Sequence, residues 1–87
     1  MSDATARRLR LRAWRRGTKE MDLILGPFVE AHVDGMDAAA CAQLEALMEE
    51  NDQDLYRWVT GARQAPGPHR ALIGAIAAFI RDRPAPR

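Results

Sequence analysis

The chain lacks most of the patterns that carry covalent linkage, membrane insertion or secretion. Its 87 residues include one cysteine, Cys41, so no disulfide can form within it. No apolar run approaches the roughly 18 to 20 residues that span a bilayer, and the N-terminus has no apolar segment of a secretory signal. We therefore expect a small protein with one modest core in a reducing compartment, in which Cys41 packs as a small hydrophobe.

Catalytic patterns are missing as well. His32 and His69 each stand alone without a cluster of metal ligands, which argues against a metal site. The glycines within 61–67 belong to a turn and not to a phosphate-binding loop. Glu20 and Asp22 point to different faces of a helix, so they cannot flank one bond as acid and base. We expect no catalytic, cofactor-binding or metal-ligating residue, and no enzyme.

Charge is nearly balanced overall but unevenly spread. The net charge is +1, yet residues 1–20 hold seven cations against two acids, a net charge of +5, and the remainder holds six cations against ten acids, a net charge of −4. Such polarity is typical of an electrostatically guided docking face. It is equally explained by a basic helix that pairs with acidic helices of its own fold.

Helical periodicity dominates the chain, and no stretch alternates as a strand does. We predict an all-α, compact single-domain bundle of about five short helices over residues 1–87, with frayed ends at 1–3 and 83–87. Short connections fit antiparallel helices. The predicted helices are 4–15, 18–32, a third capped by Asp37, a fourth after Asn51 and Asp52 that ends before Gly61, and a fifth that starts at Pro68.

Two positions complicate the first two helices. Pro27 lies inside the second helix, where it removes an amide donor, so we expect a kink or break near Leu25 and Gly26. Trp14 ends the first helix. We expect its ring to pack in the core or at its edge in preference to anchoring a partner.

A sharp corner joins these two helices at Arg16-Gly17-Thr18-Lys19-Glu20-Met21-Asp22. We predict that Gly17 adopts positive φ as the C′ residue and that Thr18 caps the next helix. Acids in the first turn after the corner and cations before it complement the helix dipoles. Good capping alone also explains this pattern, so the corner by itself does not establish a binding site.

The same residues resemble a known signature. Arg16-Gly17-xx-Glu20, followed by Met21-Asp22 and an apolar run to Pro27-Phe28, resembles the Arg-Gly-x-x-Glu motif of small succinate dehydrogenase assembly factors that promote covalent FAD attachment. The stretch Asp54-Leu55-Tyr56-Arg57-Trp58 is similar to the second landmark of that family. The likeness covers nearly the whole chain, in length and in motif order.

The resemblance implies a partner and a site. The partner would be the flavoprotein subunit of succinate dehydrogenase, with the fumarate reductase flavoprotein as a further client, and FAD would be attached to the partner and not held by this chain. Arg16, Gly17 and Glu20 match the motif, and Asp22 matches the following acidic position. Charge placement adds a surrounding basic rim. The predicted partner-binding residues are therefore Arg16, Gly17, Glu20, Asp22, Arg8 and Arg12, with Lys19 beside them.

Other functions remain open from the sequence. A basic helix followed by a glycine turn loosely resembles a helix-turn-helix, so a small DNA-binding or regulatory protein is the leading alternative, although no second basic helix follows. A structural subunit or antitoxin-like partner is another, and direct FAD binding is a third. We expect a monomer when free, no nucleic acid, no membrane association, and a bacterial cytoplasm in preference to the mitochondrial matrix.

Overall fold

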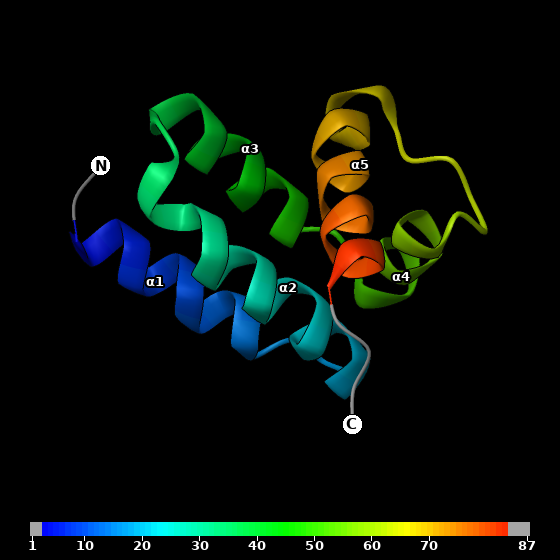
Figure 1. Ribbon diagram of the computed structural model, residues 1–87, viewed down its shortest axis with the longest axis horizontal. Coiled ribbons are helices and arrows are strands. Elements are labelled where there is room, and N and C mark those ends of the chain that lie inside the picture. Colours follow the sequence, from blue (N-terminus) through cyan, green and yellow to red (C-terminus); the bar gives the residue numbers. More distant parts are fainter. Residues whose placement is uncertain (1–2, 84–87) are drawn as a thin grey trace.

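The computed structural model describes residues 3–83 and contains five α-helices and one short 3₁₀ segment over that range (Figure 1). This confirms the predicted all-α fold. The elements, in chain order, are α1 (Asp3–Trp14), α2 (Lys19–His32), η1 (Val33–Gly35), α3 (Ala38–Met48), α4 (Asp52–Thr60) and α5 (Gly67–Asp82).

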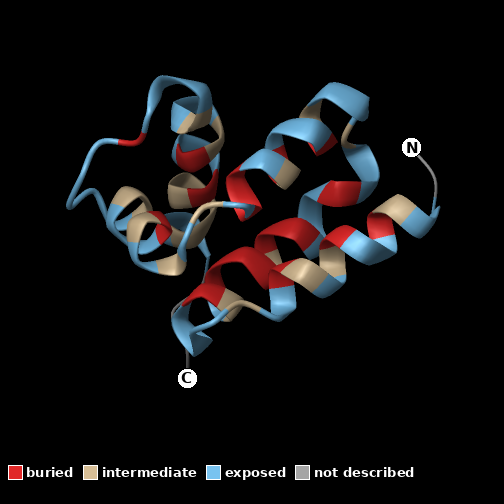
Figure 2. Cartoon of the chain, turned by 180° about the vertical axis from the view of Figure 1, so that it is seen from behind, coloured by how far each residue is buried: buried red, intermediate tan, exposed pale blue. Residues whose placement is uncertain are grey.

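The helices pack in two groups around one core. Helices α1 and α2 lie antiparallel, α3 packs against α1 and α5, and α4 and α5 form a second pair that meets α2 (Figure 1). Buried residues face inward on every helix (Figure 2). The largest fully buried side chains are Phe28, Leu9, Met21, Leu25, Leu44, Leu47, Leu55, Ile76, Val29 and Val33. Cys41 is buried among them, as expected.

Helix starts follow the predicted caps. Thr18 accepts a hydrogen bond from the amide of Met21, and Asp37 accepts one from the amide of Ala40. Asn51 caps α4 in the same way. Each cap satisfies an amide that has no partner within the helix. The predicted boundaries of α1 and α2 are correct to within a residue at each end.

The prediction was a kink or break near Leu25 and Gly26. The break is wrong, because α2 runs unbroken through Pro27 to His32. Proline at position 27 leaves the carbonyl of Leu23 without its helical donor. That carbonyl instead accepts a hydrogen bond from Nη1 of Arg83, at 3.0 Å. A side chain 60 residues away thus replaces the missing amide, and the helix need not break.

Gly26 serves packing at the crossing of α1 and α2. It is buried, and a Cβ built there would lie 2.4 to 2.5 Å from three ring carbons of Trp14, Cδ2, Cε2 and Cε3. The indole therefore lies directly on the α2 backbone, while its Nε1 donates to Glu30 at 3.2 Å. Trp14 is a partly exposed edge residue, in agreement with the packing role predicted for it.

The expected fraying concerns mostly residues outside the described range. Residues 1–2 and 84–87 lie beyond it. The two described residues in the predicted frayed ends are ordered into the fold: Asp3 starts α1, and Arg83 bonds to α2. Among the described residues, no helix is long and apolar enough to cross a membrane.

The Gly26 contact generates a prediction about stability. Gly26→Ala should destabilise the protein by about 1 to 3 kcal/mol, because the new methyl group overlaps the indole and the cost of overpacking exceeds the gain in helix propensity. Gly74→Ala is the matched control, since nothing lies within 4 Å of a Cβ there. It should stabilise α5 by up to about 1 kcal/mol. Urea unfolding measures both, and equal effects at the two glycines would contradict the packing role.

Candidate interaction site

The Arg16 side chain lies inside the fold at the corner between α1 and α2. Its side chain is 11% exposed. Nε donates to Oδ1 of Asp52 at 2.8 Å, Nη1 to the carbonyl of Met48 at 2.7 Å, and Nη2 to the carbonyl of Glu50 at 2.8 Å. The planar fork of arginine matches acceptors in these fixed directions. Arg16 therefore ties the corner to the end of α3 and the start of α4.

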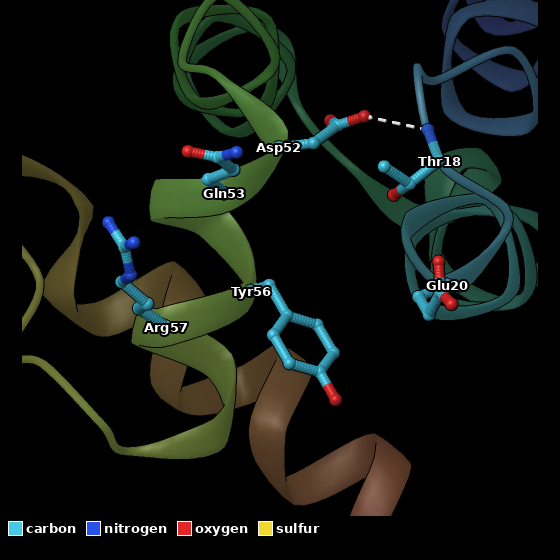
Figure 3. A pocket seen from close by; sticks show the side chains of 6 residues that line it. All are labelled: Thr18, Glu20, Asp52, Gln53, Tyr56 and Arg57. Carbon is cyan, nitrogen blue, oxygen red and sulfur yellow. Dashed lines mark hydrogen bonds between the residues drawn. The ribbon is translucent and has the colours of Figure 1, made fainter.

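Asp52 is the acceptor on which the corner closes. Besides Arg16, its carboxylate accepts from the amide of Gly17 at 2.6 Å and from the amide of Thr18 at 3.1 Å. Its side chain is 12% exposed, and it stands in the first turn of α4, where the helix dipole favours an anion. A nearly buried carboxylate needs this full set of donors to offset its lost hydration. Figure 3 shows Asp52 directed from α4 towards Thr18.

The predicted positive φ at Gly17 is wrong. Over the described residues, Gly61 is the glycine with positive φ, at 83°, and it ends α4. Space is tight at Gly17 instead, because a Cβ there would lie 3.1 Å from Oδ2 of Asp52, the atom that its own amide contacts, so a larger residue would need this carboxylate to shift. The glycine lets the carboxylate approach the backbone closely.

Asp22 completes the corner from the other side. Its Oδ1 accepts a hydrogen bond from the backbone amide of Arg16 at 2.6 Å. The end of α1 and the start of α2 are thus held by two carboxylates, Asp22 within the motif and Asp52 outside it. Asp22 is partly buried and acts here inside the chain.

Glu20 differs from the other motif residues. It is exposed, and its side chain makes no hydrogen bond or ion pair with any residue in the described range. The Arg16 side chain does not pair with Glu20, because its three guanidinium nitrogens donate to Asp52, Met48 and Glu50. The structure leaves Glu20 as the motif side chain that is free to bind something else.

The basic first helix is largely neutralised by the chain's own acids. Arg8 pairs with Glu45 on α3, and Arg12 pairs at 3.1 Å with Glu49, the residue that follows α3. Arg10 pairs with acids at the end of α2 and in η1. The charge asymmetry of the sequence is thus explained in part by intramolecular pairing. Exposed pairs of this kind contribute little to stability and leave the arginines reachable from solvent.

A surface hollow of about 400 Å³ lies beside the corner, between the start of α2 and α4. Figure 3 shows Tyr56 projecting from α4 on the side that faces α2, with Glu20 opposite. The residues that line the hollow are Thr18, Glu20, Asp52, Gln53, Tyr56 and Arg57. The hollow places the free carboxylate of the motif beside an exposed aromatic ring.

Sequence reasoning missed Asp52 and Tyr56 as parts of this site. In the sequence, Asp52 indicates the start of a helix, and an acid in a first turn is also explained by its favourable interaction with the helix dipole. Tyr56 lay within the second family landmark, and that landmark was the available signal. Nothing local to either residue indicates that α4 folds back onto the corner 36 residues earlier.

No group of three or more potential metal ligands occurs in residues 3–83. His69 instead lies 3.1 Å from Glu50 and stacks on Trp58, and His32 contacts the carbonyl of Phe28 and stacks on that ring. Both histidines therefore have packing roles.

Comparison with known proteins agrees with the motif. A family model described as "Flavinator of succinate dehydrogenase" matches residues 7–81. The chain is 41% identical over 79 residues to the FAD assembly factor SdhE of Acetobacter pasteurianus, covering 91% of this chain and 71% of the relative. It is 36% identical over 72 residues to the FAD assembly factor SdhE of Pseudomonas aeruginosa, covering 83% and 82%.

Mitochondrial proteins match as well. The chain is 33% identical over 64 residues to the mitochondrial succinate dehydrogenase assembly factor 2 of Schizosaccharomyces pombe, covering 74% of this chain. It spans 46% of that relative's length, so the mitochondrial protein carries further sequence. No solved structure matches this chain.

The three hydrogen bonds of Arg16 predict that its charge alone does not account for its contribution to stability. Arg16→Lys should lower the free energy of unfolding by about 2 to 3 kcal/mol, because an ammonium keeps the charge but cannot donate to three acceptors spread around a planar fork. Arg12→Lys is the matched control in α1, and its exposed pair should lose less than about 0.5 kcal/mol. Urea unfolding of both variants is the measurement, and an equally small loss in each would refute the network's role.

Proposed function

Since this chain belongs to the family of flavinators of succinate dehydrogenase, we propose that it binds the flavoprotein subunit of that enzyme and promotes covalent attachment of FAD to it. The named relatives support the role in flavinylation, and they give no support to a DNA-binding protein. Intramolecular pairing of the basic helix agrees with that outcome.

The observation that carries the proposal is the rigid corner with one free carboxylate. Arg16, Asp52 and Asp22 are engaged inside the chain, and they fix the backbone at Gly17 and Thr18. Glu20 lies two residues after this fixed backbone segment, and it is exposed. A preorganised side chain loses little conformational entropy on binding, which favours affinity. In this proposal Glu20 contacts the partner, and the other three residues position it.

The remaining predicted contacts fall into two groups. Gly17 is exposed beside Glu20, so its surface belongs to the proposed contact. Arg8 and Arg12 lie on the side of α1 that faces α3, where they form an outer basic rim with their acidic partners. We assign them to steering the encounter, because rim charges act mainly on association rates.

The proposed mechanism is a shift of the partner's conformational population. A helper that binds one flavoprotein conformation more tightly raises its population by that difference in affinity. If that conformation brings FAD and its attachment residue into reacting geometry, the bond forms faster without any group from the helper entering the chemistry. The chain would thus act as a non-enzymatic factor, and the partner would carry out its own flavinylation.

Several finer features belong to the same proposal. FAD ends on the partner, because the sequence offers no phosphate-binding loop for a dinucleotide. The fumarate reductase flavoprotein is a second client, and the free factor is a monomer. We also propose that the chain acts in a bacterial cytoplasm, which its similarity to the named bacterial relatives supports.

A direct test is in-gel flavin fluorescence of the denatured flavoprotein from cells that lack this gene. We expect the covalent signal to be lost, restored by the wild-type chain, and not restored by Glu20→Ala or Gly17→Arg. Glu20→Ala removes no contact within the described fold, so its helicity and stability should stay near wild type.

Asp34→Ala is the control for Glu20→Ala, since it also removes an exposed carboxylate from the same chain. It should restore flavinylation fully. A covalent signal that persists without the gene would refute the function, whereas full rescue by Glu20→Ala would refute the site and leave the function standing.

A further inference from the structure

A second hollow continues the one beside the corner. It is about 450 Å³ and lies where α2 meets α4 and α5. Glu20 and Tyr56 line both hollows, so the two form one groove with these residues at its middle. The lining residues of the second hollow are Glu20, Leu23, Ile24, Tyr56, Val59, Thr60, Ala77, Ile80, Arg81 and Arg83.

The groove beyond Glu20 is apolar and partly open to water. Leu23 is 47% exposed and Tyr56 is 45% exposed, and they are two of the four large hydrophobic side chains exposed in the described chain. Val59 and Ile80 add aliphatic surface between them. Exposed apolar side chains that gather in one concave surface are typical of a protein interaction site.

The charge of the groove selects its occupant. Arg57 and Arg81 at its edges already face Asp54 and Asp82, and Arg83 donates to the carbonyl of Leu23. Asp52 at the other end is occupied by Arg16 and two amides. Glu20 is therefore the carboxylate of the groove that has no cationic partner within residues 3–83, and it lines both hollows with apolar surface on one side.

We propose that this groove receives a segment of the flavoprotein client that sets an arginine or lysine against Glu20 and an adjacent apolar side chain against Leu23, Tyr56 and Ile80. The inference rests on the proposed function and deepens it, because it extends the interface from the motif corner to α4 and α5. Complementary charge at Glu20 fixes the register of the segment, and the apolar contact supplies affinity.

Binding of purified flavoprotein subunit by isothermal titration calorimetry tests the two halves of the groove separately. Glu20→Lys and Leu23→Ser should each weaken binding by about tenfold or more, the loss of one central contact. The matched controls are Asp34→Lys, an acid reversed in η1, and Leu11→Ser, a leucine on α1 that is 49% exposed and outside the groove. Both controls should bind within about twofold of wild type.

Photo-crosslinking identifies the segment. A benzoylphenylalanine at position 56 should capture one continuous peptide of the client that contains a lysine or arginine, whereas the same group at Gln43 on α3 should not capture it. Reversing the charge of that cation to glutamate should then restore binding of Glu20→Lys. A crosslinked peptide that contains no lysine or arginine would overturn the assignment. So would a peptide in which no such charge reversal restores the binding of Glu20→Lys.

These outcomes separate the two proposals. A wild-type chain that neither binds the flavoprotein nor supports its flavinylation refutes the proposed function. A wild-type chain that does both, while Leu23→Ser and Glu20→Lys bind as well as the controls, refutes the groove and leaves the function intact.

Discussion

The fold depends on burying one guanidinium whose three nitrogens each donate a hydrogen bond within the chain. Arg16 follows α1, precedes α2, and bonds to the last residue of α3, to the loop after it and to the first residue of α4. A charged group with 11% exposure is tolerated only when its hydrogen bonds are complete. The positions of these four helix ends are therefore set together, and the exposed Glu20 inherits its position from them.

The helices could be predicted from the sequence because capping and periodicity depend on residues only a few positions apart. The caps at Thr18, Asp37 and Asn51 each depend on a side chain and an amide three residues apart. Such spacing is visible in a sequence, and so is helical periodicity. The all-α fold follows from these two signals.

The exceptions depend on residues far apart in the chain. The continuity of α2 through Pro27 depends on Arg83, and the tight space at Gly17 depends on Asp52. Neither long-range contact leaves a periodic signal. The motif drew attention to the corner, yet the sequence did not show which of its side chains are internal and which are exposed. Contacts from α3 and α4 determine that division.

Charge in this chain is arranged in space more evenly than in sequence. The surplus of cations in residues 1–20 meets carboxylates of α2, η1, α3 and α4 across the fold. Arg7, Arg15 and Lys19 remain exposed without such a contact in residues 3–83. The field outside the molecule is therefore weaker than the sequence implies, and recognition depends more on placed groups such as Glu20.

The bond from Arg83 to Leu23 also fixes where the described chain leaves the fold. Because Arg83 lines the groove, an affinity tag or fusion partner joined directly after it would start beside the groove and compete for space with any bound segment. Helix α1 starts on the side of the fold away from α4 and α5 (Figure 1), so its N-terminal end is the better place for a label.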